Sequence, residues 1–169
     1  MLFRSAGRWA ERYPTQLARI VANPSWELGS SGYSYKSFAQ RCPELTELRL
    51  DEMTGDVTHG FDVLRPAGGR LVPYFRFPGL CADEQSIARV QPVQVTVVSG
   101  DVLSGDTSGA SATTIANTVL AKVKPGSIVI LNMTKVGAPN TEAALRRIVE
   151  GLAAKGLQPV AVSALLAGN

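Results

Sequence analysis

Segments that favour strands and segments that favour helices alternate along the chain, and this alternation limits the fold more than any other feature. Short runs of β-branched, aromatic or apolar residues predict strands at 26–28, 73–77, 92–98, 127–131 and 159–162. Apolar residues at helical spacing predict helices over 7–23, 43–65, 111–123 and 141–155. This order is typical of parallel βα units, so we predict an α/β fold. The length of the chain suits one domain over residues 1–169.

The helix expected over 141–155 carries the clearest boundary signals. Asn140 or Thr141 can cap its start, and Gly156 is expected to end it. The first helix is expected to break near Pro14, because proline cannot donate a hydrogen bond inside a helix.

Composition and charge narrow the class of protein. The 169 residues carry a net charge of +3, but the basic residues are scattered, and no basic run indicates a nucleic-acid partner. No stretch of about 18 or more apolar residues predicts a membrane span. The N-terminal segment lacks the apolar centre of a signal peptide, so the chain as written is expected in the cytoplasm.

The cysteines and the histidine give weaker signals. Cys42 and Cys81 are too few for a disulfide framework and belong to no zinc-binding motif. They either form one disulfide in an oxidising compartment or stay as two half-buried thiols. His59, the single histidine, lies within an expected helix and is interpreted as solvated rather than catalytic.

In parallel βα folds, functional residues gather in the loops after the carboxyl ends of the strands. These loops are expected at 29–36, 78–83, 99–106 and 132–140. Arg76 can hold a carboxylate through two hydrogen bonds, or can pair with a surface acid. Asp101 and Asp106 can act as a base or a ligand, or can bond to a turn. Asn132 can donate a hydrogen bond to a substrate but cannot carry a proton.

The loop from Gly29 to Lys36, GSSGYSYK, has the layout of a metal-binding loop but contains no residue that binds a transition metal well. The chain also has no Ser–His or Cys–His pairing, phosphate-binding glycine loop or HExxH motif. The residues by themselves therefore indicate a polar cleft without a recognisable catalytic set.

Four segments together resemble the polysaccharide deacetylase family, the NodB-homology domain. ELGSSGYSY resembles the family's E-(I/L)-G-N-H-(S/T)-x-(S/T)-H stretch, PYFRFPG its Arg-x-Pro motif, VTVVSGDVLSGD the segment of its motif Asp, and KPGSIVILN its C-terminal stretch. The resemblance covers essentially the whole chain. It implies a distorted (β/α) barrel, of about six strands here, that removes acetyl groups from N- or O-acetylated sugars. In that chemistry one Asp and two His bind a divalent metal such as zinc or cobalt, which activates water.

Most residues on which this chemistry depends are replaced. The two metal-binding histidines of the family fall on Ser31 and Tyr35, and the acid histidine falls on Asn132. Two family positions survive: Arg76, which would orient the catalytic base, and Asp101, which would tune the acid histidine. We therefore expect no metal cofactor, unless a remade site holds zinc or cobalt.

The family's first motif, Thr-Phe-Asp-Asp, would precede Met1 and is absent, so the barrel is expected to be incomplete, with its first strand missing. The strand edge beside residues 1–3 would then lack a partner. We expect a homodimer across this edge, closure by the N-terminal residues, or a fragment of a longer product. The third alternative would explain the absent signal peptide in a family that works mostly outside the cytoplasm.

The resemblance and its departures predict a deacetylase-like domain without conventional metal-dependent activity. We expect it to bind an acetylated oligo- or polysaccharide, or a protein partner, through the former cleft. Tyr33, Tyr35 and Phe77, beside Pro78, would stack on sugar rings, with ordinary packing around the rim as the alternative. A second hypothesis is a carbohydrate N- or O-deacetylase with a remade site built on Asp101 and Asp106. Whether the chain is an enzyme is left open.

Overall fold

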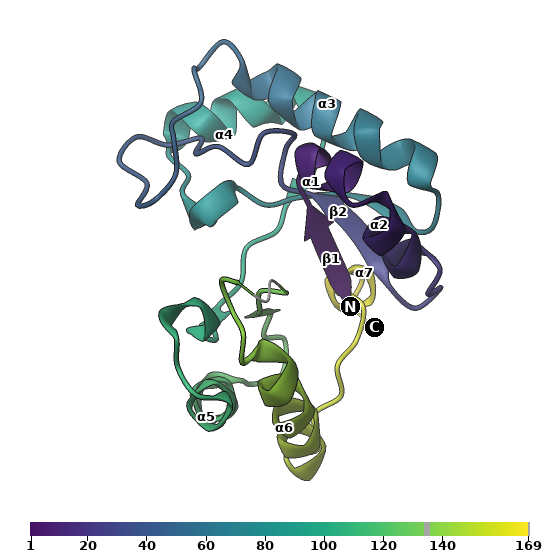
Figure 1. The fold of residues 1–169 in the computed structure, drawn as a ribbon, viewed down its shortest axis with the longest axis vertical. Helices are drawn as coiled ribbons and strands as arrows, with labels where there is room; N and C mark the ends of the chain where they lie inside the picture. Colours follow the sequence, from purple (N-terminus) through teal and green to yellow (C-terminus); the bar gives the residue numbers. More distant parts are fainter. Residues whose placement is uncertain (134–135, 169) are drawn as a thin grey trace. The chain divides into compact units, whose positions relative to one another are not determined.

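The computed structural model describes residues 1–133 and 136–168. It contains two compact units, Met1–Ser99 and Gly100–Asn169 (Figure 1). That both belong to a single domain stays a prediction. None of the helices in the described part of the chain has the length and apolar character that a membrane span requires.

The first unit is a parallel four-stranded sheet with helices. Its strands are β1 (Leu2–Ser5), β2 (Glu27–Ser30), β3 (Leu71–Phe75) and β4 (Thr96–Val97), in the order β1-β2-β3-β4. Its helices are α1 (Gly7–Arg12), α2 (Pro14–Val21), α3 (Met53–Leu64) and α4 (Glu84–Val90). The sequence did not predict β1, which the N-terminal residues form at one edge of the sheet. Whether these residues close the gap left by a missing strand stays a prediction. The dimer across that edge stays a prediction.

The second unit contains one parallel strand pair and three helices. The strands are β5 (Val102–Leu103) and β6 (Val129–Ile130), and the helices are α5 (Ala112–Lys122), α6 (Thr141–Ala154) and α7 (Val162–Leu166). The described residues thus form six short strands, and every pairing between them is parallel. This agrees with the predicted fold class.

Several predicted elements are confirmed. The first helix divides at Pro14, and α5 and α6 follow the predicted ranges within one residue at either end. Gly156 has φ +69°, the left-handed conformation that ends a helix and that glycine adopts without strain. The cap of α6 differs from the prediction, because neither expected side chain caps it. Asn140 donates instead to the carbonyl of Ala110.

Three element predictions are wrong. The helix expected from residue 43 begins only at Met53, because the preceding segment pairs with Ser37 through backbone hydrogen bonds from Ser37 to Thr46 and from Leu48 to Ser37. The strand expected over 92–98 shrinks to β4, since residues 91–93 form a 3-10 turn and Gln94 has φ +56°. Residues 159–162 form no strand, and Val162 begins α7.

One face of the four-stranded sheet carries the core. Phe3 of β1 and Leu28 of β2 pack with α1, α2 and α3, and Phe75 of β3 packs in a second cluster with α3 and α4. Side chains alternate across a strand, so Arg4 and Tyr74 lie on the opposite face, away from these helices. The candidate site lies on that opposite face of the sheet.

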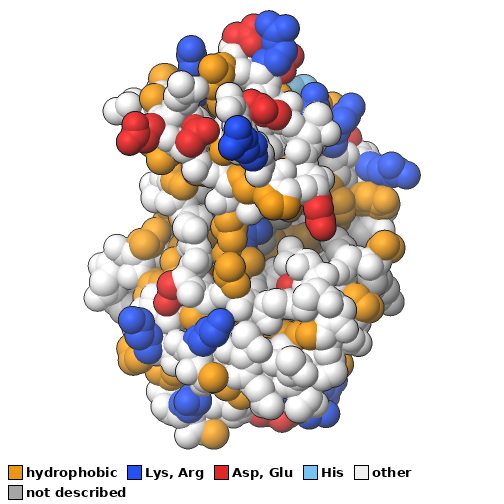
Figure 2. Space-filling model, turned by 90° about the vertical axis from the view of Figure 1, so that its left-hand side faces the viewer, with side chains coloured by type: hydrophobic (Ala, Val, Ile, Leu, Met, Phe, Trp, Pro, Cys, Tyr) orange, Lys and Arg blue, Asp and Glu red, His pale blue; other side chains and the backbone are white. Residues whose placement is uncertain are grey.

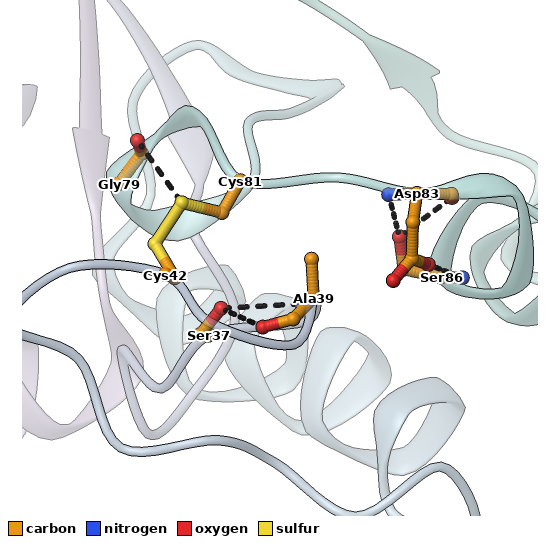
Figure 3. The surroundings of a disulfide bond; sticks show 7 residues. All are labelled: Ser37, Ala39, Cys42, Gly79, Cys81, Asp83 and Ser86. Carbon is orange, nitrogen blue, oxygen red and sulfur yellow. Dashed lines mark hydrogen bonds between the residues drawn. A yellow bond between two sulfur atoms is a disulfide. The ribbon is translucent and has the colours of Figure 1, made fainter.

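A disulfide bond joins Cys42 to Cys81, 39 residues apart, and resolves the alternative that the sequence left open (Figure 3). It links the segment after β2 to the segment after β3. Nearby, Asp83 and Ser86 form a reciprocal capping box that starts α4, with each side chain bonded to the other residue's backbone. These contacts hold two of the strand-end segments close to the sheet.

Candidate anion-binding site at the strand ends

The loop that follows β2 is held from α3 by one carboxylate. Asp56 accepts hydrogen bonds from the backbone nitrogens of Tyr33 (2.9 Å) and Ser34 (3.0 Å). Gly32, at φ +79°, lies so close to Asp56 that a β-carbon there would collide with the carboxylate. Ser31 is buried, and its backbone nitrogen donates to the carbonyl of Ser5 at 3.0 Å. The predicted loop therefore exists, and its shape is determined by α3.

Arg4 crosses the sheet toward the end of β3 because β2 has a glycine beside it. Arg4 pairs with Gly29 in the register of β1 and β2. A β-carbon on Gly29 would lie 3.4 Å from Cγ of Arg4 and only 2.7 Å from the carbonyl oxygen of Tyr74. The missing side chain thus leaves room both for the arginine stem and for the β3 backbone.

Arg76 continues the sheet pattern just beyond β3. Its backbone nitrogen donates to the carbonyl of Ser30 at 3.1 Å, which keeps this segment beside β2. By alternation from the buried Phe75, the Arg76 side chain lies on the same sheet face as that of Arg4. The side chains of Arg4 and Arg76 therefore share one face of the sheet, close enough for the charge of Arg76 to lower the pKa of Arg4.

Neither guanidinium is fully paired. Among the described residues, Nε of Arg4 and Nη1 of Arg76 are buried without a hydrogen-bond partner. Burial, and then the charge of Arg76, lower the pKa of Arg4 to about 9. Burial lowers the pKa of Arg76 to about 10. Both lowered pKa values express the cost of keeping a positive charge away from water, and the pKa of Arg4 also reflects repulsion from Arg76.

Tyr35 is the third member of this site. The interaction with Tyr35 raises the pKa of both arginines, opposing burial, which places its hydroxyl near each guanidinium. Its side chain is 43% exposed, and its backbone has φ +57°. A left-handed conformation is unfavourable for a bulky residue, so the loop holds Tyr35 in place against a local cost.

The other predicted binding residues serve the fold. Tyr33 stacks on His59 with ring centres 4.0 Å apart, and its hydroxyl donates to Glu11 at 3.1 Å. Phe77 is 4% exposed and lies in an aromatic cluster with Phe38 and Phe75, and Pro78 is buried as well. The expectation that Phe77 and Pro78 offer surfaces to a sugar is therefore corrected, because both are buried. Tyr33 is half-buried, and its role in sugar binding stays a prediction.

A second polar cluster lies in the second unit around a buried carboxylate. Asp106, 2% exposed, accepts hydrogen bonds from the backbone nitrogen of Asn132 (2.6 Å), its Nδ2 (2.9 Å) and the hydroxyl of Thr141 (2.8 Å). These bonds join the 3-10 turn at 106–108, the end of β6 and the start of α6. All three donors belong to groups that do not titrate near neutral pH, so the cluster cannot supply a proton to a leaving group.

Asp101 does not contact Asn132 in the way the resemblance implied. Its carboxylate accepts hydrogen bonds from the hydroxyl of Ser127 (2.8 Å) and the backbone nitrogen of Ile128 (2.7 Å), and these bonds lower its pKa. The carboxylate beside Asn132 is that of Asp106. The role assigned to Asp101 is therefore corrected: Asp101 fastens the start of the β6 segment.

The residues at the strand ends do not fit the metal that the family implies. No group of three or more His, Cys, Asp or Glu side chains in the described ranges could hold a metal ion. Tyr35, at one predicted histidine position, offers a phenol instead of an imidazole, and it interacts electrostatically with both Arg4 and Arg76. Positive charges at this distance repel a divalent cation. The donor set and the charge both disagree with a metal centre.

Short strands that pair only in parallel, with helices between them, define the class of this protein as an α/β fold of the (β/α) barrel type. A family model described as polysaccharide deacetylase matches residues 2–98. The chain belongs to the polysaccharide deacetylase family.

Individual relatives support this placement. A peptidoglycan-N-acetylglucosamine deacetylase of Bacillus cereus is 27% identical over 160 residues, which are 94% of this chain and 55% of that protein. The chain thus spans about half the length of this curated relative.

Two solved structures share the fold. One is a family 4 carbohydrate esterase pseudoenzyme from Bacillus anthracis, with a TM-score of 0.83 and 19% identity, covering 98% of this chain and 54% of that one. The other is an acetyl xylan esterase from Clostridium thermocellum in complex with a cobalt ion, with a TM-score of 0.81 and 21% identity over 98% and 76% of the two chains. At these identities the likeness establishes the fold alone.

Arg4 is the site residue that sequence reasoning missed. It lies in a strand of only four residues, which is too short to show a period. One signal was present: a charged residue between Phe3 and Ser5, in a segment that ends just before a predicted helix. Read as a strand, LFRS would have placed Arg4 on the same sheet as Arg76.

Proposed function

We propose that this chain is a polysaccharide deacetylase-like domain that binds a glycan at the strand ends of its first unit and lacks conventional metal-dependent activity. One observation carries the proposal: Tyr35, where the family has a metal-binding histidine, lies beside two guanidiniums instead of beside metal ligands. Loss of a single acid or base costs about 100- to 10,000-fold in rate, and the described residues contain no group of three or more His, Cys, Asp or Glu side chains for the metal that would activate water.

The half-exposed ring of Tyr35 supports the binding role. Sugar rings stack on aromatic faces that remain accessible, and Tyr35 is the aromatic residue of this loop whose ring is not packed on another. Figure 2 shows basic and acidic side chains interspersed over one face of the molecule, with no large patch of basic side chains. Such a surface gives no reason to prefer a nucleic acid over a sugar.

Two assays test the proposal. Acetate release from chitooligosaccharides, with zinc or cobalt added, is expected to stay at the level of a protein-free blank. Titration of the same sugars by calorimetry is expected to show binding that Tyr35→Ala removes and Tyr13→Ala leaves intact, since Tyr13 is an exposed tyrosine between α1 and α2.

Either assay can overturn the proposal. Metal-dependent acetate release that Asp106→Asn abolishes would establish a remade deacetylase site. Binding that is absent, or equal in the wild type and Tyr35→Ala, would remove the glycan role from this loop.

A further inference from the structure

We propose that Arg4, Arg76 and Tyr35 form a receptor for a carboxylate, so that the sugar bound at the strand ends is an acidic one, such as a hexuronate. The choice of a sugar as the carrier rests on the proposed function. The proposed contact with an anion involves only residues of the first unit.

Each of the two guanidiniums has a hydrogen-bond donor that lacks a partner among the described residues. Nε of Arg4 and Nη1 of Arg76 are buried and lack a hydrogen-bond partner among the described residues. An unsatisfied buried donor is costly, and more so when it is charged. A bound oxygen anion would satisfy both donors and neutralise part of the charge.

The nearby carboxylates are engaged elsewhere. Glu27, at the start of β2, forms an ion pair with Arg70 at 3.2 Å. Asp56 binds the backbone of Tyr33 and Ser34. Both of these carboxylates therefore have partners other than the arginine pair.

A carboxylate suits this arrangement. Guanidinium groups form pairs of parallel hydrogen bonds with the two coplanar oxygens of a carboxylate, and Arg4 and Arg76 approach from two different strands. Tyr35 adds a hydroxyl near both arginines and an accessible ring on which the attached sugar can stack. The glycine at position 29 keeps the path of Arg4 open.

The decisive experiment compares D-glucuronate with D-glucose at equal ionic strength, with inorganic phosphate as a third probe. The binding of each is measured by NMR through the shift of the Arg side-chain Nε–Hε signals. Glucuronate is expected to shift the signal that Arg4→Gln removes, and glucose is expected to shift none. Arg4→Gln is expected to weaken glucuronate binding by about 10- to 100-fold, the effect of one charge-assisted hydrogen-bonded pair.

Matched variants separate charge from shape. Arg8→Gln removes an exposed arginine of α1 and is expected to leave the affinity for glucuronate unchanged. Arg4→Lys keeps the charge but not the planar fork, so it is expected to retain only part of the affinity. Arg4→Gln also relieves the repulsion from Arg76, so it is expected to melt at or above the wild-type temperature, which shows that the variant folds.

The outcomes distinguish this inference from the proposed function. Equal binding of glucuronate and glucose, both lost in Tyr35→Ala, would overturn the carboxylate receptor and leave the glycan role intact. Phosphate binding as tight as glucuronate binding would overturn the choice of a sugar acid. Glucuronate binding that depends on Arg4, without any binding of chitooligosaccharides, would support the receptor and contradict the neutral glycan. No response to glucuronate would overturn the receptor.

Discussion

Replacing Asp106 by alanine is expected to destabilise the second unit more than any other single loss of a polar side chain in it. The carboxylate is buried and accepts three hydrogen bonds, two from Asn132 and one from Thr141. A hydrogen bond to a charged group contributes roughly 1.5–3 kcal/mol, and a donor left without a partner adds its own cost. Because the three bonds share one acceptor and are not additive, we expect a loss of about 4 kcal/mol.

Hydrogen exchange measured by mass spectrometry can locate this loss. A change of about 4 kcal/mol corresponds to roughly a 1,000-fold fall in protection for the peptides of α6, provided that the unit opens cooperatively. Trp9 and Trp26 both lie in the first unit, so tryptophan fluorescence reports on that unit separately. Its urea transition is expected to move little.

Asp101→Ala is the matched control. Asp101 accepts two hydrogen bonds, against three at Asp106, and is exposed to water. Water can replace an exposed acceptor, so its removal is expected to change exchange in α6 far less. Asp106→Asn, which keeps one oxygen, should fall between the two. Equal exchange in Asp106→Ala and Asp101→Ala would show that the buried cluster does not hold α6 in place.

Three further predictions concern the first unit. The double variant Cys42→Ala/Cys81→Ala is expected to lose about 4 kcal/mol from loop entropy over 39 residues; an unchanged urea midpoint by tryptophan fluorescence would contradict this. Because the pKa of Arg4 is about 9 in the folded state and well above that in the unfolded state, the unfolded chain binds the proton more tightly, and stability rises with pH above about 9. Arg4→Gln should therefore raise the melting temperature at pH 7 and raise it less at pH 10, and a gain that is equal at both values would refute the electrostatic cause. Finally, the double variant Ser31→His/Tyr35→His is expected to bind cobalt weakly in calorimetry. Adding Arg4→Leu should tighten cobalt binding at least 10-fold, because it removes one repelling charge. No gain in affinity would show that the guanidinium does not oppose the metal.

The sequence predicted the elements whose local signals agree with their packing. In α5 and α6 the apolar stripe, the flanking turns and the terminal glycine all indicate the same ends. The segment 43–52 has a helix-like spacing of leucines, but the disulfide of Cys42 and the backbone bonds of Ser37 hold it in turns and irregular backbone. The disulfide and these backbone bonds join residues that are separated in the sequence. The spacing of apolar residues therefore could not predict them.

The candidate site was predicted in part for the same reason. Arg76 and Tyr35 follow strands that were predicted, so their place at the strand ends could be inferred. Asp101 and Asp106 lie five residues apart in one glycine-rich turn, and composition cannot decide which of them contacts Asn132. The register of β5 and β6 decides it, since the two strands bring Asp106, and not Asp101, beside the end of β6.

The charge at the strand ends shows that this site differs from a metal centre that has merely lost its ligands. If Ser31 and Tyr35 stand where the family has histidines, as the resemblance predicts, their side chains remove metal donors, and a weak cation site would be the result if nothing else had changed. Arg4 goes further, because it brings a second guanidinium beside Arg76 and creates a local field that opposes any cation. A folded protein keeps such a pair at a cost, and that cost is offset only when an anion is bound. The stability of the first unit should therefore depend on anions in solution, which a site that had only decayed would not show.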